Sequence, residues 1–159
     1  MTLFDLIPKE KSPGEMRGRV VLAGPGFVGQ PALIMALKQV GLEPVFAGSR
    51  DEVAELIAEG DAVLALCHAS FSDGRLREVL AATVRDGWEI PLIVCADFYE
   101  PRVYLDSMEA GAYDYITYPY DRRTEWVIGN GLREGLERVR GVEGKKGRLH
   151  KTVSGSARG

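Results

Sequence analysis

Cysteine is nearly absent from this chain, with two residues among 159. Both, Cys67 and Cys95, stand inside apolar runs, which is typical of reduced core thiols and not of a disulfide framework. We expect inert thiols, with a redox switch as the lesser alternative, because diagonal neighbours on adjacent strands lie about 7 to 8 Å apart. His, Cys, Asp and Glu show no metal-ligand spacing, so we expect neither a metal nor a cofactor.

Long apolar runs and a strong net charge are also missing. No run approaches the ~20 residues that span a bilayer, and the first residues include Asp5 and lack a basic start before an apolar core. We therefore predict a cytoplasmic protein without a membrane span. A net charge of −3 is too mild to indicate a nucleic-acid binder or a disordered chain, and 45% hydrophobic residues fit one domain with a real core.

The two ends of the chain differ in composition from its middle. Residues 1–18 combine a small apolar patch with prolines and charges, which favours a flexible arm; a docking peptide is the alternative. Residues 141–159 are rich in Gly, Ser and Lys and are predicted to be a disordered basic tail. An electrostatic tether is the alternative there, but no aromatic residue stands among the charges, so we do not expect nucleic acid as a partner.

Between these ends, short apolar runs alternate with helical periodicity. Strands are predicted at 19–23, 44–47, 61–67, 91–96 and 114–118, and helices at about 29–40, 51–59, 73–86, 101–110 and 122–140. Ser49 and Glu52 have capping-box spacing, Pro101 suits a first helical turn, and Gly111 suits a left-handed helix end. Five βα units with apolar strands require a parallel sheet covered on both faces, so the fold class is α/β and doubly wound.

A glycine-rich turn follows the first predicted strand. Gly24, Gly26 and Gly29 form a G-x-G-x-x-G pattern between a strand and a helix, which is the context of a dinucleotide-binding turn. The acid expected after the second strand is missing, so only binding of a 2′-phosphate through Arg50 could be argued. Nucleotide or NAD(P) binding at this turn therefore stays as an alternative function.

The segments of residues 19–140 resemble the receiver domain of bacterial two-component response regulators. The resemblance rests on IPLIVCA at 90–96, EAGA at 109–112, DYITYPYD at 114–121, and residues 61–66 followed by SDG at 72–74. It implies a flavodoxin-like sheet of five parallel strands in the order 2-1-3-4-5, with helices on both faces.

The same resemblance implies that the phosphorylation chemistry is lost. The acidic pair that would hold Mg²⁺ falls on Gly24 and Pro25, the phosphoacceptor on Leu66, the hydroxyl on Ala96 and the lysine on Tyr118. A slip of one residue would put Cys67 at the acceptor position, which is no carboxylate either. Replacing the whole set avoids a stranded buried charge, so we predict a dedicated pseudo-receiver that is not an enzyme.

Three polar residues near these positions need separate interpretations. Asp97 and Asp73 are expected to be loop carboxylates or helix caps, and a regulator that uses one of them as an unorthodox phosphoacceptor is the second alternative function. His68 is expected to be a neutral loop or core histidine. The sequence alone shows no hydroxyl or thiol at a geometry that would support a nucleophile and base pair.

The features that remain are those of a binding surface. By resemblance, Tyr115 matches the aromatic residue that moves on activation, and Pro119 and Tyr120 match the turn after the fifth strand. Together with Trp126 they are our predicted partner-binding residues, on the face of the fourth helix, fifth strand and fifth helix. The glycines of the last helix, Gly129, Gly131 and Gly135, are expected to pack on the sheet, with a small-residue face for another chain as the alternative.

These observations predict an atypical receiver in bacterial signalling that binds protein partners without phosphorylation. A homodimer through the same face is a second form of that hypothesis.

Overall fold

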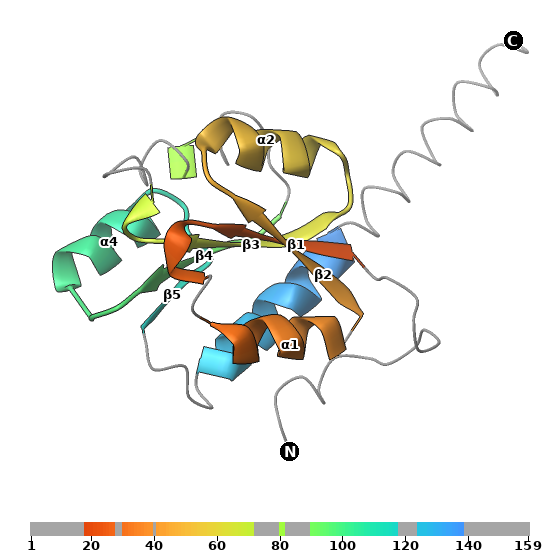
Figure 1. The fold of residues 1–159 in the computed structure, drawn as a ribbon. Coiled ribbons are helices and arrows are strands. Elements are labelled where there is room, and N and C mark those ends of the chain that lie inside the picture. The colour runs from red at the N-terminus through yellow and green to blue at the C-terminus, as the bar shows by residue number, and fades with distance from the viewer. Residues whose placement is uncertain are drawn as a thin grey trace, which may run out of the picture.

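Five parallel strands form the centre of the molecule. The computed structural model describes residues 18–27, 30–39, 41–71, 80–81, 90–117 and 124–138. The strands are β1 (Gly18–Ala23), β2 (Leu42–Ala47), β3 (Ala62–His68), β4 (Leu92–Ala96) and β5 (Asp114–Thr117). Their order in the sheet is β2-β1-β3-β4-β5, and every neighbouring pair is parallel (Figure 1). The predicted fold class and strand order are therefore confirmed.

In the described part of the chain, helices connect and cover these strands. They are α1 (Pro31–Gln39), α2 (Arg50–Ala58), α4 (Pro101–Glu109) and a helix of residues 124–138, and a short 3₁₀ turn, η2 (Pro25–Phe27), follows β1. Of the helix expected at 73–86, only residues 80–81 lie within the described part of the chain, and they are helical. Residues 1–17 of the expected arm and all of the expected tail lie outside the described residues, whereas Gly18 already belongs to β1.

The helices bury one core layer on each face of the sheet, because the strands are apolar on both sides. Val53 of α2 and Leu80 pack with Val21 and Ala65 on one face, beside side chains of α4. On the other face, Leu37 of α1 and the apolar stripe of helix 124–138 pack against other side chains of β1, β3 and β4. In Figure 1 α2 lies above the sheet, and α1 and the blue helix lie below it. No helix in the described part of the chain has the length and apolarity that crossing a membrane requires.

Local chemistry accounts for several helix ends. Ser49 caps α2 by accepting a hydrogen bond from the Glu52 N–H at 3.2 Å, as predicted. The Glu52 carboxylate reaches back to the N–H of Gly48 and not to that of Ser49, at 2.8 Å, so the capping box closes one residue earlier than its usual form. Pro101 opens α4, and Gly111 follows the end of α4 at a φ of 108°.

A β-bulge in β3 explains the glycines of the last helix. Between Arg19 and Val20 the register of β1 against β3 shifts by one residue, which leaves Val63 unpaired. A Cβ on Gly135 would lie 1.6 Å from the Val63 carbonyl oxygen, and one on Gly131 would lie 3.0 Å from Ile93 Cδ1. Both glycines therefore face the sheet, which confirms the packing interpretation for them. The alternative, a small-residue face for a second chain, is wrong for these two positions.

Candidate functional site at the carboxyl ends of the strands

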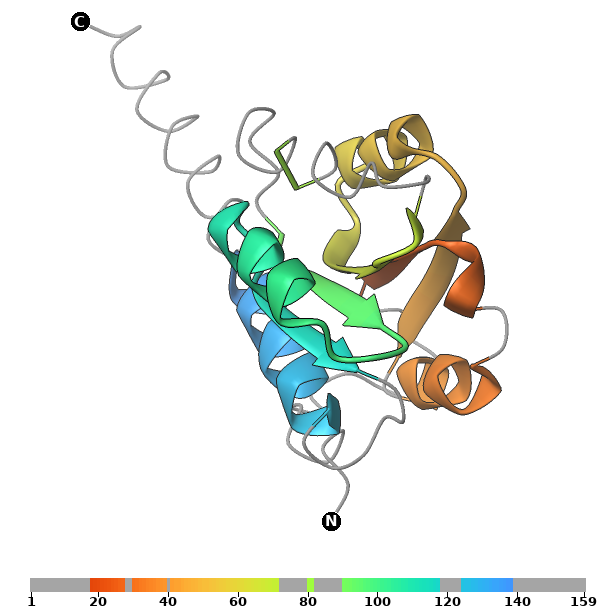
Figure 2. The ribbon, with the colours of Figure 1, turned by 90° about the vertical axis from the view of Figure 1, so that its left-hand side faces the viewer.

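A pocket of about 260 Å³ opens where the carboxyl ends of β3, β4 and β5 meet. In a doubly wound sheet this edge is where ligands and reacting groups usually gather. The pocket is lined by His68, Ala69, Ser70, Ala96, Asp97, Phe98, Glu100, Val103 and Tyr115. Figure 2, turned to show α4 and β5 in front, views the molecule from this part of the sheet. Its polar groups come from the end of β3, from the loops after β3 and β4, and from Tyr115 of β5, so the strand ends decide which side chains meet here.

The end of β3 differs from the sequence-based expectation. We predicted a strand ending at Cys67 with the former acceptor position at Leu66, but β3 continues to His68, which pairs with Cys95 of β4. Leu66 lies two residues before this end and is entirely buried in the core. Its side chain is therefore not at the strand-end site, and His68 occupies that place. The observed strand has the predicted length of seven residues but lies one residue further along the chain.

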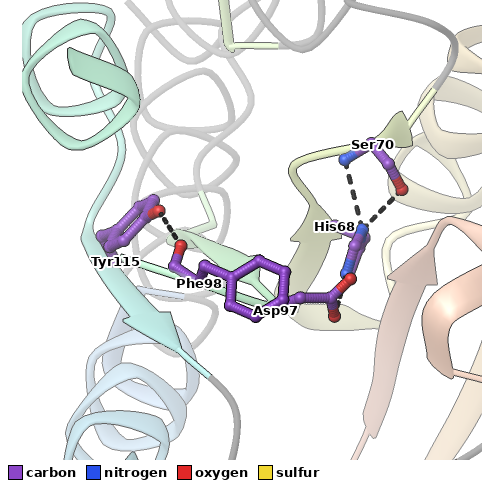
Figure 3. A network of polar contacts seen from close by, with 5 residues as sticks. All are labelled: His68, Ser70, Asp97, Phe98 and Tyr115. Carbon is purple, nitrogen blue, oxygen red and sulfur yellow. Dashed lines mark hydrogen bonds and ion pairs between the residues drawn. The ribbon is translucent and has the colours of Figure 1, made fainter. Parts of the chain in front are cut away.

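Each ring nitrogen of His68 has its own partner (Figure 3). Nδ1 lies 2.6 Å from Ser70 Oγ and 3.2 Å from the backbone nitrogen of Ser70, whereas Nε2 lies 3.2 Å from Asp97 Oδ1. A backbone N–H can only donate, so Nδ1 is the acceptor nitrogen. The neutral ring then carries its proton on Nε2 and donates it to the Asp97 carboxylate.

Two glycines make room for this imidazole. Gly24, at a φ of 119°, would place a Cβ 2.9 Å from His68 Cβ, and Gly26 would place one 2.8 Å from His68 Cδ2. Phe27, which is buried, meets the ring edge-on with centroids 6.2 Å apart. Close packing against His68 thus explains glycine at these two positions, and no bound pyrophosphate is required to explain it. Gly29, the third glycine of the pattern, lies outside the described residues.

The glycine turn also differs in shape from a turn that leads straight into a helix. After Gly24 the chain forms the 3₁₀ turn η2, and α1 begins only at Pro31. Arg50, the other residue of the nucleotide hypothesis, is the first residue of α2. Among the described residues, His68 fills the space beside Gly24 and Gly26, so the geometry there does not favour nucleotide binding.

Acidic side chains at the strand ends are few and lie outside the expected positions. Gly24 and Pro25 do follow β1, and Ala96 does end β4, as predicted. Two carboxylates line the pocket, Asp97, whose side chain is 69% exposed, and Glu100. Within the described ranges, no group of three or more His, Cys, Asp or Glu side chains is placed to hold a metal ion. Tyr118 and Asp73, named in the predictions, lie outside the described residues.

Tyr115 closes the pocket on the β5 side, and it is buried. Its hydroxyl donates to the Phe98 carbonyl oxygen at 3.2 Å, and its ring meets those of Tyr99 and Tyr104 edge-on at 6.1 and 5.7 Å. Burial raises the pKa of the Tyr115 hydroxyl. Only 8% of the residue is exposed, so its ring points inward in this structure, and its role in partner binding stays a prediction. Its ring and hydroxyl support two exposed neighbours, Tyr99 and Phe98.

Those exposed residues surround the β5 edge of the sheet. Phe98 and Tyr99 precede α4, Leu105 lies on α4, and Trp126 lies on helix 124–138; each is more than half exposed. We call these four residues the aromatic edge. Because α4 and helix 124–138 pack on opposite faces of the sheet, they flank β5 from both sides. Trp126 was predicted on this surface, whereas Pro119 and Tyr120 lie outside the described residues.

The two cysteines belong to different core layers. Cys67 packs on the α2 and α4 face, and Cys95 packs on the α1 face, so the sheet separates their thiols. Burial raises the pKa of the Cys67 thiol to about 12. The expectation of inert core thiols fits this geometry, and a disulfide between them is excluded.

Comparisons with known proteins find relatives in structure only. No family model matches the sequence, and no curated protein matches it. NtrX from Brucella abortus, solved in complex with ADP, matches with a TM-score of 0.62 and 16% identity; the match covers 87% of this chain and 30% of NtrX. This chain therefore spans under a third of that protein.

Two isolated receiver domains match over nearly their whole length. The receiver domain of a putative Luxo repressor protein from Vibrio parahaemolyticus has a TM-score of 0.62 and 14% identity, covering 80% of this chain and 96% of its own. That of the putative response regulator NarL from Mycobacterium tuberculosis has a TM-score of 0.60 and 18% identity, covering 79% and 98%. The fold is thus that of response-regulator receiver domains.

Sequence reasoning missed the contact between His68, Ser70 and Asp97. The spacing H-x-S after an apolar run was the available signal for the first pair, since a strand that ends at the histidine brings residue i+2 back towards its ring. Asp97 could be placed beside them only once the end of β3 was known.

Proposed function

We propose that this chain is a bacterial, cytoplasmic signalling module with a receiver fold that acts by binding protein partners and does not depend on phosphorylation of an aspartate. The observation that carries the proposal is the composition of the strand-end site. Gly24 and Pro25 follow β1, His68 ends β3 and Ala96 ends β4, so the backbone of a receiver encloses an imidazole.

Metal-assisted phosphoryl transfer needs ligands that these positions do not supply. Mg²⁺ is held by carboxylates, and a phosphoryl group needs both the metal and a nearby acceptor. Asp97, which follows β4, is hydrogen-bonded to His68 and mostly exposed. Within the described residues, no group of three potential ligands is placed to hold the metal that such a transfer needs, which supports an output that does not depend on a phosphoryl group.

The aromatic edge supports the binding part of the proposal. Exposed Trp and Tyr side chains are the residue types that most often dominate protein interfaces. Here Tyr99 rests on the buried ring of Tyr115, which holds its backbone neighbour Phe98 by a hydrogen bond. A partner that covers this edge would contact Trp126, with Pro119 and Tyr120 as further proposed contacts. A second copy of this chain is the alternative occupant.

Treatment with a small phosphodonor tests the first part of the proposal. We expect the protein, incubated with acetyl phosphate and Mg²⁺, to show no stable gain of ~80 Da in its intact mass. An authentic receiver domain treated in parallel provides the positive control.

A gain that Asp97→Asn or Asp73→Asn removes would instead establish an unorthodox phosphoacceptor. It would overturn the claim of phosphorylation independence.

A further inference from the structure

Three polar groups at the strand-end site stand in a row: the Ser70 hydroxyl, the His68 imidazole and the Asp97 carboxylate (Figure 3). The two contacts, 2.6 Å to Nδ1 and 3.2 Å from Nε2, use opposite ring nitrogens. This row is the order of nucleophile, base and orienting acid that activates serine for attack.

The serine side of the row has the correct proton arrangement. Nδ1 accepts from the Ser70 backbone N–H, so its lone pair is free of a proton and also faces Ser70 Oγ. An imidazole nitrogen in that state can take the hydroxyl proton as the oxygen attacks. Ser70 itself is exposed, so an electrophile can reach its oxygen.

The contact between His68 and Asp97 cannot be predicted from local sequence. Asp97 comes from the loop after β4, 29 residues along the chain from His68, and its carboxylate accepts from Nε2. A carboxylate at that nitrogen fixes the tautomer and stabilises the imidazolium that forms during attack.

The His68 side chain is closely packed in this alignment. A Cβ on Gly24 would lie 2.9 Å from His68 Cβ and one on Gly26 would lie 2.8 Å from the ring atom Cδ2, and Phe27 meets the ring edge-on. Such preorganisation is what lowers the entropic cost of attack.

The adjoining pocket limits the chemical class of the electrophile. Its volume of about 260 Å³ suits a small acyl group, and Val103 and Tyr115 provide apolar walls. Its charged lining groups are the carboxylates of Asp97 and Glu100. Negative walls disfavour anionic donors such as acyl phosphates and favour neutral esters and thioesters.

We infer that Ser70 is a site of covalent acylation by neutral acyl esters or thioesters, with His68 as its general base and Asp97 as the positioning residue. Ser70 Oγ attacks the acyl carbonyl carbon and His68 Nδ1 takes the hydroxyl proton. The bond from that carbon to the ester oxygen or thioester sulfur then breaks, and the imidazolium returns the proton to the leaving group. The products are an O-acylserine and a free alcohol or thiol, and this inference does not rest on the proposed function.

The test uses p-nitrophenyl acetate on the full chain, without added metal. We expect one acetyl group, a gain of ~42 Da in intact mass that maps to Ser70 and is absent from Ser70→Ala. Ser49, whose hydroxyl accepts from the Glu52 N–H at the start of α2, serves as an internal reference in the same digest and should stay unmodified. Acetyl phosphate, as the anionic donor, should react more slowly.

Variants of the other two groups separate chemistry from structure. His68→Gln should slow the acetylation about 100-fold, and thermal unfolding checks that it folds. Asp97→Asn changes a mostly exposed side chain, and it should both slow the reaction and move its pH profile to lower pH, because a neutral amide no longer stabilises the imidazolium. The inference is overturned if no adduct forms on Ser70, if His68→Gln reacts at the wild-type rate, or if Asp97→Asn leaves the rate and pH profile unchanged.

Discussion

At the scale of single residues, His68 explains more of the strand-end site than any other side chain. Its side chain packs against Gly24 and Gly26, where a Cβ would clash with it. Its two ring nitrogens contact Ser70 and Asp97. A pattern that looks like a phosphate-binding turn in the sequence is therefore a packing requirement in the structure. The consequence is an energetic coupling between residues 26 and 68.

That coupling predicts the outcome of a double-mutant cycle. Gly26→Ala should lower the free energy of unfolding by about 1 to 3 kcal/mol, because the new Cβ meets a buried, hydrogen-bonded ring that cannot shift. In a His68→Ala background the same change should cost much less. Gly48→Ala is the matched control, since its Cβ would meet only Glu52 Oε2, at 3.8 Å. Equal costs in both backgrounds, measured by urea unfolding, would contradict the packing account.

Cys67 gives a pH prediction at the same scale. Burial raises the pKa of its thiol from 9.0 to about 12, so the folded state favours the neutral thiol. The unfolded chain binds fewer protons than the folded one once the pH exceeds about 9, so stability is lost as the pH rises from there towards 12. Between pH 8 and 10.5, the wild type should lose about 2 kcal/mol more of its unfolding free energy than Cys67→Ala. Equal losses of unfolding free energy in the two proteins would show that this thiol does not cause the pH dependence.

At the scale of elements, helix 124–138 depends on the sheet more than on its own propensity. Its buried glycines each weaken an isolated helix by up to ~1 kcal/mol relative to Ala. Gly135 instead permits contact with the Val63 carbonyl at the β3 bulge, so helix and bulge form one packing unit.

Gly135→Ala should therefore be strongly destabilising although alanine is the better helix former. A Cβ 1.6 Å from a backbone oxygen forces the helix away from the sheet, and we expect a loss of roughly 3 kcal/mol or more in unfolding free energy. Chemical denaturation followed by circular dichroism measures this. A neutral or stabilising result would mean that the helix does not pack on β3 at Gly135.

The elements themselves were predictable from the sequence, because buried parallel strands read as apolar runs and the helices carry caps at Ser49, Pro101 and Gly111. The predicted bounds of β1, β3, β4 and β5 agree with the structure to within one residue, and β2 begins two residues earlier than predicted. The site was predicted less well. β3 ends one residue later than predicted, and Leu66, assigned by resemblance to the end of this strand, lies two residues before it, where His68 ends the strand. Tyr115 was named as a partner-binding residue by resemblance, and a match by spacing does not say that its ring points inward in this structure.

At the scale of the whole molecule, the receiver fold carries a polar strand-end pocket and an exposed apolar surface. The strand-end pocket holds His68 and its partners, whereas the aromatic edge surrounds β5. Phe98 belongs to both, and Tyr115, which lines the pocket, packs against Tyr99 of the aromatic edge. A change in the pocket that moved Tyr115 would therefore alter the proposed binding surface, with no phosphoryl group involved.

The most direct test of this account is a quantitative pull-down from native lysate, performed with and without acetyl phosphate and Mg²⁺. The full chain is compared with Trp126→Ala and with Met35→Ala, an equally exposed apolar side chain on α1. We predict that one protein is retained in equal amounts with and without the phosphodonor, that Trp126→Ala reduces it about tenfold or more, and that Met35→Ala retains it. Capture that requires the phosphodonor, or that is the same for Trp126→Ala as for the wild type, would contradict the account.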